Sequence, residues 1–407
     1  MSDPRYAEET ALDWDRFVSA YWDRAPVVFR GLGAPVYPPD AVLRAIARAR
    51  PSPDEAEQRV RFVLDGRQLT QLQPWLPGPG DADFDAYARR VRQRAGAPCD
   101  YALIVNTLHR HGYGVWDAGR RFFHGLWERV GVPSSGAIST MFHGNYERTP
   151  VGVHKDRFAT FLFVLQGRKR MRFWSQRPWT EAVATRVDYA QYLDASFAID
   201  VAPGDVLYWP SDYYHVGETA GDGHATSVNV GIPRHEHRLA YDLDGMMPLV
   251  PPATAADGGS AAAAPMFAAP GNGLPPALAA ALDDVRAQLR ADRLRSGMLA
   301  LHLQLLTGAG FAPPPPLAST AAPADGDGLR LRDARFPIAW ARDGAGALCG
   351  ACGHVRRIDD PGDALAGLLR RLNAGDTVAA GEARDAWPQA GPLLHWLLSA
   401  RALATTP

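Results

Sequence analysis

The sequence predicts a mainly β fold with flanking helices, followed by a helical region and a small α+β module. Two observations carry this prediction. Residues 137–233 consist of short β-branched and aromatic runs separated by glycine and proline, which is typical of the strands of a barrel or jelly roll. The segments before and after this region repeat apolar side chains at helical spacing. With 407 residues, the chain is long enough for two or three units with separate cores.

The first 130 residues supply the flanking elements. Periodic apolar residues and the prolines that interrupt them predict helices at 14–22, 40–50, 84–94 and 119–130, with extended pieces at 26–30 and 101–108. We expect these elements to surround the β-rich region, so that residues 1–248 form one domain.

Three segments follow that domain. Residues 249–276 are rich in alanine, glycine and proline, and we interpret them as a linker. Residues 277–312 predict a helical hairpin, which we regard as a candidate dimerisation element for a homodimer. Residues 326–407 predict two strands, a helix at 363–373 and a last helix ending near residue 402. These elements favour a winged-helix-like module.

Charge and composition exclude several classes of protein. Lysine and arginine total 43 against 44 acidic residues, so no overall basic field attracts nucleic acid, and we expect no nucleic-acid partner. Three cysteines are too few for a disulfide framework, and the first residues lack the features of a signal peptide. No run approaches the 18 apolar residues or so that cross a membrane. We therefore expect a cytoplasmic protein with no membrane partner.

One short motif carries metal-binding chemistry. His154 and Asp156 lie two residues apart on a predicted strand and therefore face the same side. His215 follows 59 residues after Asp156, at the end of the sequence PGDVLYWPSDYYH, which predicts a strand that returns beside the first. Two imidazoles and one carboxylate on one face form the facial triad that suits non-haem iron(II) and leaves positions open. We predict that these three residues bind the metal and are catalytic.

A lysine on a neighbouring predicted strand is a candidate contact for an anionic molecule bound near the metal. In the predicted strand that begins at Arg168, alternation places Lys169 on the same face as the apolar Met171 and Phe173. A buried ammonium group needs an anionic partner, and the distal carboxylate of 2-oxoglutarate is one such partner. The alternative interpretation is a solvated run of surface charge.

The motifs HKD, LQGRKRMRFW and PGDVLYWPSDYYH resemble those of the JmjC/cupin-type oxygenases that depend on iron(II) and 2-oxoglutarate. The early segment FVSAYWDRAPVVFRG is similar to the bacterial ribosomal-oxygenase group. The resemblance implies a double-stranded β-helix core, iron bound by His154, Asp156 and His215, and 2-oxoglutarate contacted by Lys169. It extends over roughly residues 12–240. The approach GNYERTPVGVHKD departs from the glycine-rich pattern of the ribosomal oxygenases, so a ribosomal substrate does not follow.

The implied reaction is hydroxylation of a side chain of a protein or peptide, with O2 as oxidant, by hydrogen abstraction at a ferryl group and rebound. Thr149, Asn229 and Tyr101 are candidate inward contacts to 2-oxoglutarate or to the metal, and His143 is a candidate pocket residue. The alternatives are a hydroxylase of a free amino acid or natural-product intermediate, a catalytically silent cupin scaffold, and a cupin that uses another metal without 2-oxoglutarate.

A second pattern resembles a zinc motif. Cys349, Cys352 and His354 offer three ligands at best, whereas a closed zinc site needs four. We therefore interpret this segment as a hairpin with buried thiols.

Overall fold

The computed structural model describes residues 5–48, 60–96, 98–146, 149–221, 223–234, 283, 286, 290–359 and 361–406. The chain divides into two compact units, one made of Met1–His237 and Gly308–Ala318, the other of Arg238–Thr307 and Ser319–Pro407. Within the described ranges, none of the helices has the length and apolar character needed to cross a membrane.

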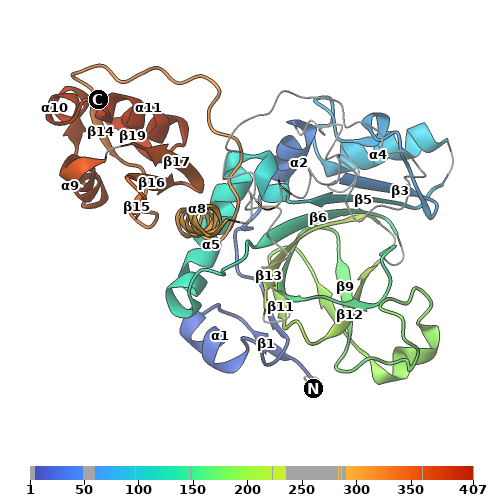
Figure 1. Ribbon diagram of the computed structural model, residues 1–407. Helices are drawn as coiled ribbons and strands as arrows, with labels where there is room; N and C mark the ends of the chain where they lie inside the picture. The colour runs from blue at the N-terminus through green and yellow to red at the C-terminus, as the bar shows by residue number, and fades with distance from the viewer. Residues whose placement is uncertain are drawn as a thin grey trace, which may run out of the picture. The chain divides into compact units, whose positions relative to one another are not determined.

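Two sheets build the first unit (Figure 1). The larger has the order β1-β2-β11-β8-β13-β6-β5-β3-β4, and the smaller has the order β10-β9-β12-β7. Their bounds are β1 Ala7–Glu9, β2 Val27–Phe29, β3 Val60–Leu64, β4 Arg67–Gln68, β5 Tyr101–Asn106, β6 Ile138–Gly144, β7 His154–Lys155, β8 Phe158–Gln166, β9 Lys169–Trp174, β10 Phe197–Val201, β11 Val206–Trp209, β12 Tyr214–Thr219 and β13 Ala225–Pro233.

The two sheets enclose an apolar core. Leu162 and Leu207 of the larger sheet pack in one buried cluster with Met171 and Phe173 of the smaller sheet. These residues alternate along their strands with residues on the opposite face, as expected when one face of each strand points into a barrel. The arrangement confirms the predicted double-stranded β-helix.

Helices cover the outer face of the larger sheet (Figure 1). Phe17 of α1 and Phe123 of α5 stack edge-on or tilted against Phe161 of β8, which alternates with the inward Leu162. The helical elements are α1 Trp14–Ala20, α2 Pro39–Arg48, η1 Gln73–Trp75, α4 Phe84–Ala95, η2 Leu108–His111, α5 Tyr113–Val130 and η3 Ala190–Ala195. Aromatic packing thus fixes these helices on the sheet.

Local capping sets where two of these helices begin and end. The carboxylates of Asp13 and Asp83 accept hydrogen bonds from backbone N–H groups in the first turns of α1 and α4. Gly96, with a φ of 78°, ends α4 in the left-handed conformation that glycine adopts most easily. The helix predicted at 119–130 begins six residues earlier, at Tyr113, because Gly112 is its N-cap.

The second unit combines helices with two small sheets, in the orders β15-β16-β17 and β18-β14-β19. Its elements are α8 Ala291–Thr307, β14 Gly328–Leu331, β15 Ala339–Asp343, β16 Gly346–Ala351, β17 His354–Ile358, α9 Gly362–Asn373, β18 Val378–Ala379, α10 Ala380–Ala386, α11 Ala390–Ser399 and β19 Leu403–Thr406. Leu303 of α8 packs with Leu348 of β16 in the core. The predicted α+β character of this module is confirmed.

Part of the predicted organisation lies outside the described residues. This holds for the linker at 249–276 and for nearly all of the first helix of the hairpin at 277–312, whereas α8 occupies most of the second half. The domain boundaries that we expected, the winged-helix-like character and a role in dimerisation stay predictions.

Candidate metal centre

Strand pairing brings the two predicted histidine ligands face to face. β7 and β12 are antiparallel, and His154 is the direct partner of His215 in their register. Side chains that are direct partners in a ladder share one face, and the two imidazole centroids lie 4.5 Å apart. Asp156, two residues beyond His154, completes the group, since the ligand atoms of all three residues lie within 4.8 Å of one another.

Backbone carbonyls orient both imidazoles. Nδ1 of His154 lies 2.9 Å from the carbonyl oxygen of Gly152, and Nδ1 of His215 lies 3.3 Å from that of Tyr213. A carbonyl oxygen only accepts, so each Nδ1 carries a proton, and in the neutral ring the lone pair is then on Nε2. These Nε2 atoms lie 3.5 Å and 3.6 Å from the two carboxylate oxygens of Asp156. The lone pairs and the carboxylate therefore converge on one point.

The surroundings keep His215 neutral. Burial lowers the pKa of His215, the neighbouring His154 lowers it further, and the carboxylate of Asp156 opposes both effects. A neutral imidazole is the form that binds a metal. The donor set of two imidazoles and a carboxylate, with side chains that are not fully enclosed, fits iron(II) with open positions.

Lys169 is buried on the same inner face as His215. In the pairing of β9 with β12, Lys169 is the partner of Thr219 and Phe173 is the partner of His215. Lys169 and Phe173 are four residues apart on β9, which is about 13 Å between their Cα atoms at a strand rise of about 3.3 Å. Its ammonium group donates a hydrogen bond to the hydroxyl of Tyr146 and lies 4.3 Å from the centroid of that ring. Burial lowers the pKa of Lys169 to about 7. A negative partner would relieve this cost.

Other polar atoms on the inner face also lack hydrogen-bond partners among the described residues. Buried side-chain atoms that have no hydrogen-bond partner in the described part of the chain include Oγ1 of Thr219, Oγ of Ser227 and Oδ1 of Asn229. Ser227 and Asn229 face inward, because they pair with the inward Val164 and Leu162 of β8. Buried polar atoms are rarely left unsatisfied. A polar molecule between Lys169 and the metal ligands fits this environment, and 2-oxoglutarate has the required carboxylates.

Thr149 lies close to the same inner face. Its backbone N–H donates to the carbonyl of Gly217, which lies between His215 and Thr219 on β12. A Cβ atom built at Gly217 would come within 3.2 Å of Cγ2 of Thr149, so the missing side chain lets Thr149 approach. The structure thus brings Thr149, Asn229 and Lys169 onto the inner face that carries His215.

Tyr101 lies apart from this group. β5 pairs with β6 so that Ala102 opposes Gly144 and Leu103 opposes His143, which puts Tyr101 and His143 on the face that the helices cover. There the hydroxyl of Tyr101 lies 2.8 Å from Nε2 of His143. Tyr101 and His143 therefore face away from His154 and His215, and a contact of Tyr101 with the co-substrate or metal stays a prediction that this strand parity disfavours. Strand parity is the physical reason.

Sequence reasoning missed three inward polar residues. Thr219 and Ser227 have the same strand parity as His215 and Asn229, so alternation could have identified them. Tyr146 follows the end of β6, where no periodic pattern exists. Only the fold shows that its hydroxyl contacts Lys169.

The cysteine pattern forms a hairpin turn. Cys349 is buried within β16, Cys352 adopts a φ of 49° at the turn, and burial raises the pKa of the Cys349 thiol to about 12. Among the described residues, the group of His154, Asp156 and His215 is the one cluster of three ligand-type side chains within metal-binding reach.

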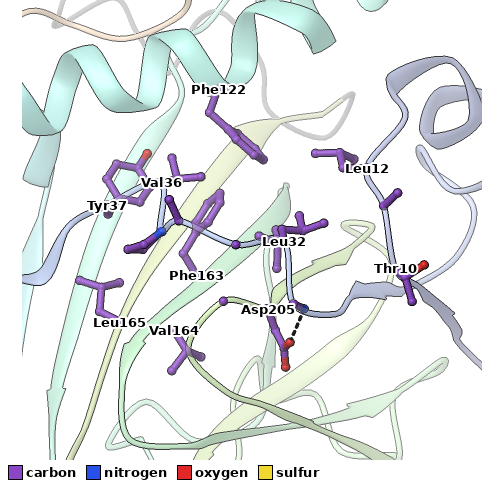
Figure 2. A pocket seen from close by; sticks show the side chains of 17 residues that line it. Thr10, Leu12, Leu32, Val36, Tyr37, Phe122, Phe163, Val164, Leu165 and Asp205 are labelled. Atoms are coloured by element: carbon purple, nitrogen blue, oxygen red, sulfur yellow. Dashed lines mark hydrogen bonds between the residues drawn. The ribbon is translucent and has the colours of Figure 1, made fainter.

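A separate pocket of about 580 Å³ lies between the segment 31–37, Phe122 and strand β8. Figure 2 shows that Leu12, Leu32 and Phe122 line it together with Phe163, and that Asp205 bonds to the backbone of this segment. Its lining is mainly apolar and contains none of the predicted metal ligands. We therefore place the chemistry between the two sheets and not in this pocket.

The family comparison agrees with this geometry. Residues 126–237, which contain β6 to β13 and all three predicted ligands, match the model of the JmjC domain family. The match confirms the expected type of core, and the domain has the fold and the donor set of a 2-oxoglutarate-dependent dioxygenase.

Solved structures resemble the chain over nearly its whole length. The X-ray structure of Escherichia coli YcfD has 16% sequence identity and a TM-score of 0.47, with 98% of this chain and 99% of that chain covered. A structure of YcfD, described as a ribosomal oxygenase from Escherichia coli in complex with cobalt and 2-oxoglutarate, has 16% identity, the same coverage and a TM-score of 0.44. No curated protein matches the sequence.

Proposed function

We propose that this protein is an iron(II)- and 2-oxoglutarate-dependent dioxygenase that hydroxylates a side chain of a protein or peptide. The observation that carries the proposal is the single inner face of the JmjC domain. That face holds His154 and His215 as direct ladder partners, Asp156 beside them, and the buried Lys169 further along. On the same face, Oγ1 of Thr219, Oγ of Ser227 and Oδ1 of Asn229 have no hydrogen-bond partner among the described residues.

Each of these side chains has a defined role in the proposal. Bound iron(II) would supply oxygen activation at positions that the three ligands leave open. His154 and His215 bind through Nε2 because their Nδ1 atoms donate to backbone carbonyls. Lys169 receives the distal carboxylate of 2-oxoglutarate, and Tyr146 holds the ammonium group in place.

Further contacts position the co-substrate and exclude water. Thr149 and Asn229 contribute polar atoms on the same face as Lys169. Met171, Phe173 and Trp209 belong to the buried apolar cluster that lies on this face and excludes water. A shielded cavity protects a reactive oxidant from quenching by solvent.

Two observations support a protein or peptide as the substrate. JmjC-type oxygenases, as the sequence resemblance implies, act mostly on protein side chains, and a separate α+β unit agrees with a macromolecular substrate. A hydroxylase of a free amino acid or natural-product intermediate is the second candidate. It is favoured by the mainly apolar inner wall, which would also receive a small molecule.

Succinate formation from 2-oxoglutarate tests the proposal. We expect the iron-loaded protein to form succinate, to lose this activity with a chelator and to increase it when tryptic peptides of cell extract are added. Stimulation by free amino acids and not by peptides would establish the second candidate. An iron-bound protein that forms no succinate under any of these conditions would contradict the enzyme class.

A further inference from the structure

Trp209 carries a buried hydrogen-bond donor for which the described residues offer no acceptor. Its side chain is 1% exposed and belongs to the apolar cluster between the two sheets. The indole Nε1 atom is buried as well, and no atom of the described residues accepts its hydrogen. An indole N–H only donates, so its partner has to be a lone pair. Such a donor destabilises the folded protein, because it has lost the water that bonds it in the unfolded chain.

Other buried tryptophans of this chain are satisfied. The indole N–H groups of four of them each donate to a backbone carbonyl, and these are Trp116, Trp127, Trp174 and Trp179. Trp174 is as deeply buried as Trp209, with an exposed fraction of 1%, and its acceptor is the carbonyl oxygen of Tyr192 at 2.8 Å. The missing partner of Trp209 is therefore not a general property of buried indoles in this fold.

Trp209 lies at the metal end of the inner face. It is the last residue of β11 and has the same strand parity as Leu207, which points into the barrel. The centroid of its ring lies 5.1 Å from that of His215 and 5.4 Å from that of Phe173, the ladder partner of His215. Lys169 is four residues from Phe173, toward the other end of this face. The unsatisfied donor thus lies beside a candidate metal ligand and away from the buried cation.

The chemistry of 2-oxoglutarate offers an acceptor at this end. The molecule has a carboxylate at each end, and the proposed function gives the distal one to Lys169. The other carboxylate, beside the keto group, then lies toward the metal. A carboxylate offers several lone pairs and no hydrogen, so one that binds a metal can still accept a hydrogen bond. A group that only accepts matches an indole that only donates.

We propose that the indole N–H of Trp209 donates to the carboxylate of 2-oxoglutarate that lies beside its keto group. This inference rests on the proposed function. Trp209 binds the co-substrate at the metal end, as Lys169 does at the distal end. The free protein carries the cost of an unsatisfied donor, and the bound co-substrate removes it. Loss of this N–H should therefore weaken co-substrate binding without weakening the fold.

Replacement of one indole by its sulfur isostere tests the inference. Benzothienylalanine, introduced at position 209, keeps the shape of tryptophan and has a sulfur atom in place of the N–H. In calorimetric titrations of the manganese(II)-loaded protein without oxygen, the dissociation constant of 2-oxoglutarate should rise roughly 10- to 100-fold, because a hydrogen bond to a charged group is lost. The midpoint of thermal unfolding of the free protein should stay the same or rise, because no hydrogen bond within the protein is lost.

The matched control is the same replacement at position 174. There the N–H donates to the carbonyl of Tyr192, on the face of β9 opposite to Phe173. We expect the reverse pattern. The midpoint of unfolding should fall by about 2–4 °C, because a buried carbonyl loses its donor. The dissociation constant of 2-oxoglutarate should change less than about twofold, because this indole does not meet the co-substrate.

Three outcomes would overturn the inference. The first is wild-type affinity for 2-oxoglutarate in the protein with the isostere at 209 or in Trp209→Phe, which also lacks the N–H. The second is a lower unfolding midpoint with the isostere at 209, since the N–H would then have a partner inside the protein. The third is weaker manganese(II) binding with unchanged affinity for 2-oxoglutarate at saturating metal, which would make Trp209 a support of the metal ligands. A wild-type protein that binds manganese(II) but no 2-oxoglutarate would instead overturn the proposed function, and the inference with it.

Discussion

The buried polar side chains on the two faces of strand β13 differ in their hydrogen bonding. On the face that the helices cover, Thr226 accepts or donates a hydrogen bond of 2.8 Å with Nδ1 of His143, and His143 in turn bonds Tyr101. On the inner face, one and three residues further on, Ser227 and Asn229 each have a polar atom for which the described residues offer no partner. We call Thr226, His143 and Tyr101, whose side chains bond to one another, the closed network. Ser227 and Asn229, on the opposite face of the same strand, do not belong to it.

The difference separates structural polar groups from ligand-binding ones. An unsatisfied buried polar atom costs about 1–3 kcal/mol, so a core does not retain several of them unless a bound molecule satisfies them. Burial also lowers the pKa of His143 well below its usual range, which favours a neutral ring inside the closed network. The unpartnered groups lie on the inner face that also carries Lys169 and the three residues that could hold a metal ion.

The largest expected effect concerns the metal ligands. Asp156→Ala removes one of three donors, so we expect metal-dependent succinate formation to fall by about a thousandfold or to vanish. His302→Ala, which removes an exposed histidine of α8, should leave the activity unchanged. If Asp156→Ala kept wild-type activity, the inner face would not be the ligand-binding face.

The next effect concerns Lys169. Lys169→Met keeps the length of the side chain but removes the charge, so we expect the dissociation constant of 2-oxoglutarate to rise roughly 30- to 150-fold, which corresponds to about 2–3 kcal/mol. Calorimetric titration with manganese(II) in the absence of oxygen measures it. Arg168→Met, on the exposed neighbour, should have little effect. Equal affinity in both variants would show that Lys169 does not bind the carboxylate.

A third test addresses how the backbone holds His154. Gly152 has a φ of 76°, and a Cβ atom at this position would lie 2.6 Å from the carbonyl oxygen of Arg186. We expect Gly152→Ala to lower the rate of succinate formation roughly tenfold or more, because the segment that orients His154 must shift. The control is Gly221→Ala. Gly221 also has a positive φ, but a Cβ atom there would meet no other atom within 4 Å, so the rate of succinate formation should stay near that of the wild type.

The affinity for 2-oxoglutarate should also depend on pH. Burial lowers the pKa of Lys169 to about 7, so the co-substrate-free protein loses the ammonium charge as the pH rises above 7. Binding of the carboxylate then requires uptake of a proton, and the dissociation constant should rise about tenfold per pH unit between pH 7 and 9. Below pH 7 it should be flat. The Lys169→Met variant should show no such slope.

The smallest expected effect on activity comes from the closed network. Tyr101→Phe leaves Nε2 of His143 without its partner, so we expect a loss of about 1–2 kcal/mol in the free energy of unfolding and less than a twofold change in the affinity for 2-oxoglutarate. Urea unfolding and the calorimetric titration measure the two quantities. A large loss of affinity in a stable variant would return Tyr101 to the binding site.

The sequence by itself determined the candidate metal site and the strand face of Lys169, because both depend on local alternation. His154 and Asp156 are two residues apart, and Lys169 shares the parity of Met171 and Phe173. Helices at 84–94 and 119–130 were likewise readable from their apolar spacing, with shifts of one to six residues at the ends.

Only the tertiary structure decided the rest. Tyr101 begins the strand YALIVN, which is apolar on both faces, so its parity relative to the barrel depends on pairing with β6. Tyr146 lies in an irregular segment, whose neighbours depend on contacts between residues far apart in the chain. Periodicity assigns a residue to a face of its own strand. Which face encloses the site depends on the register between distant strands.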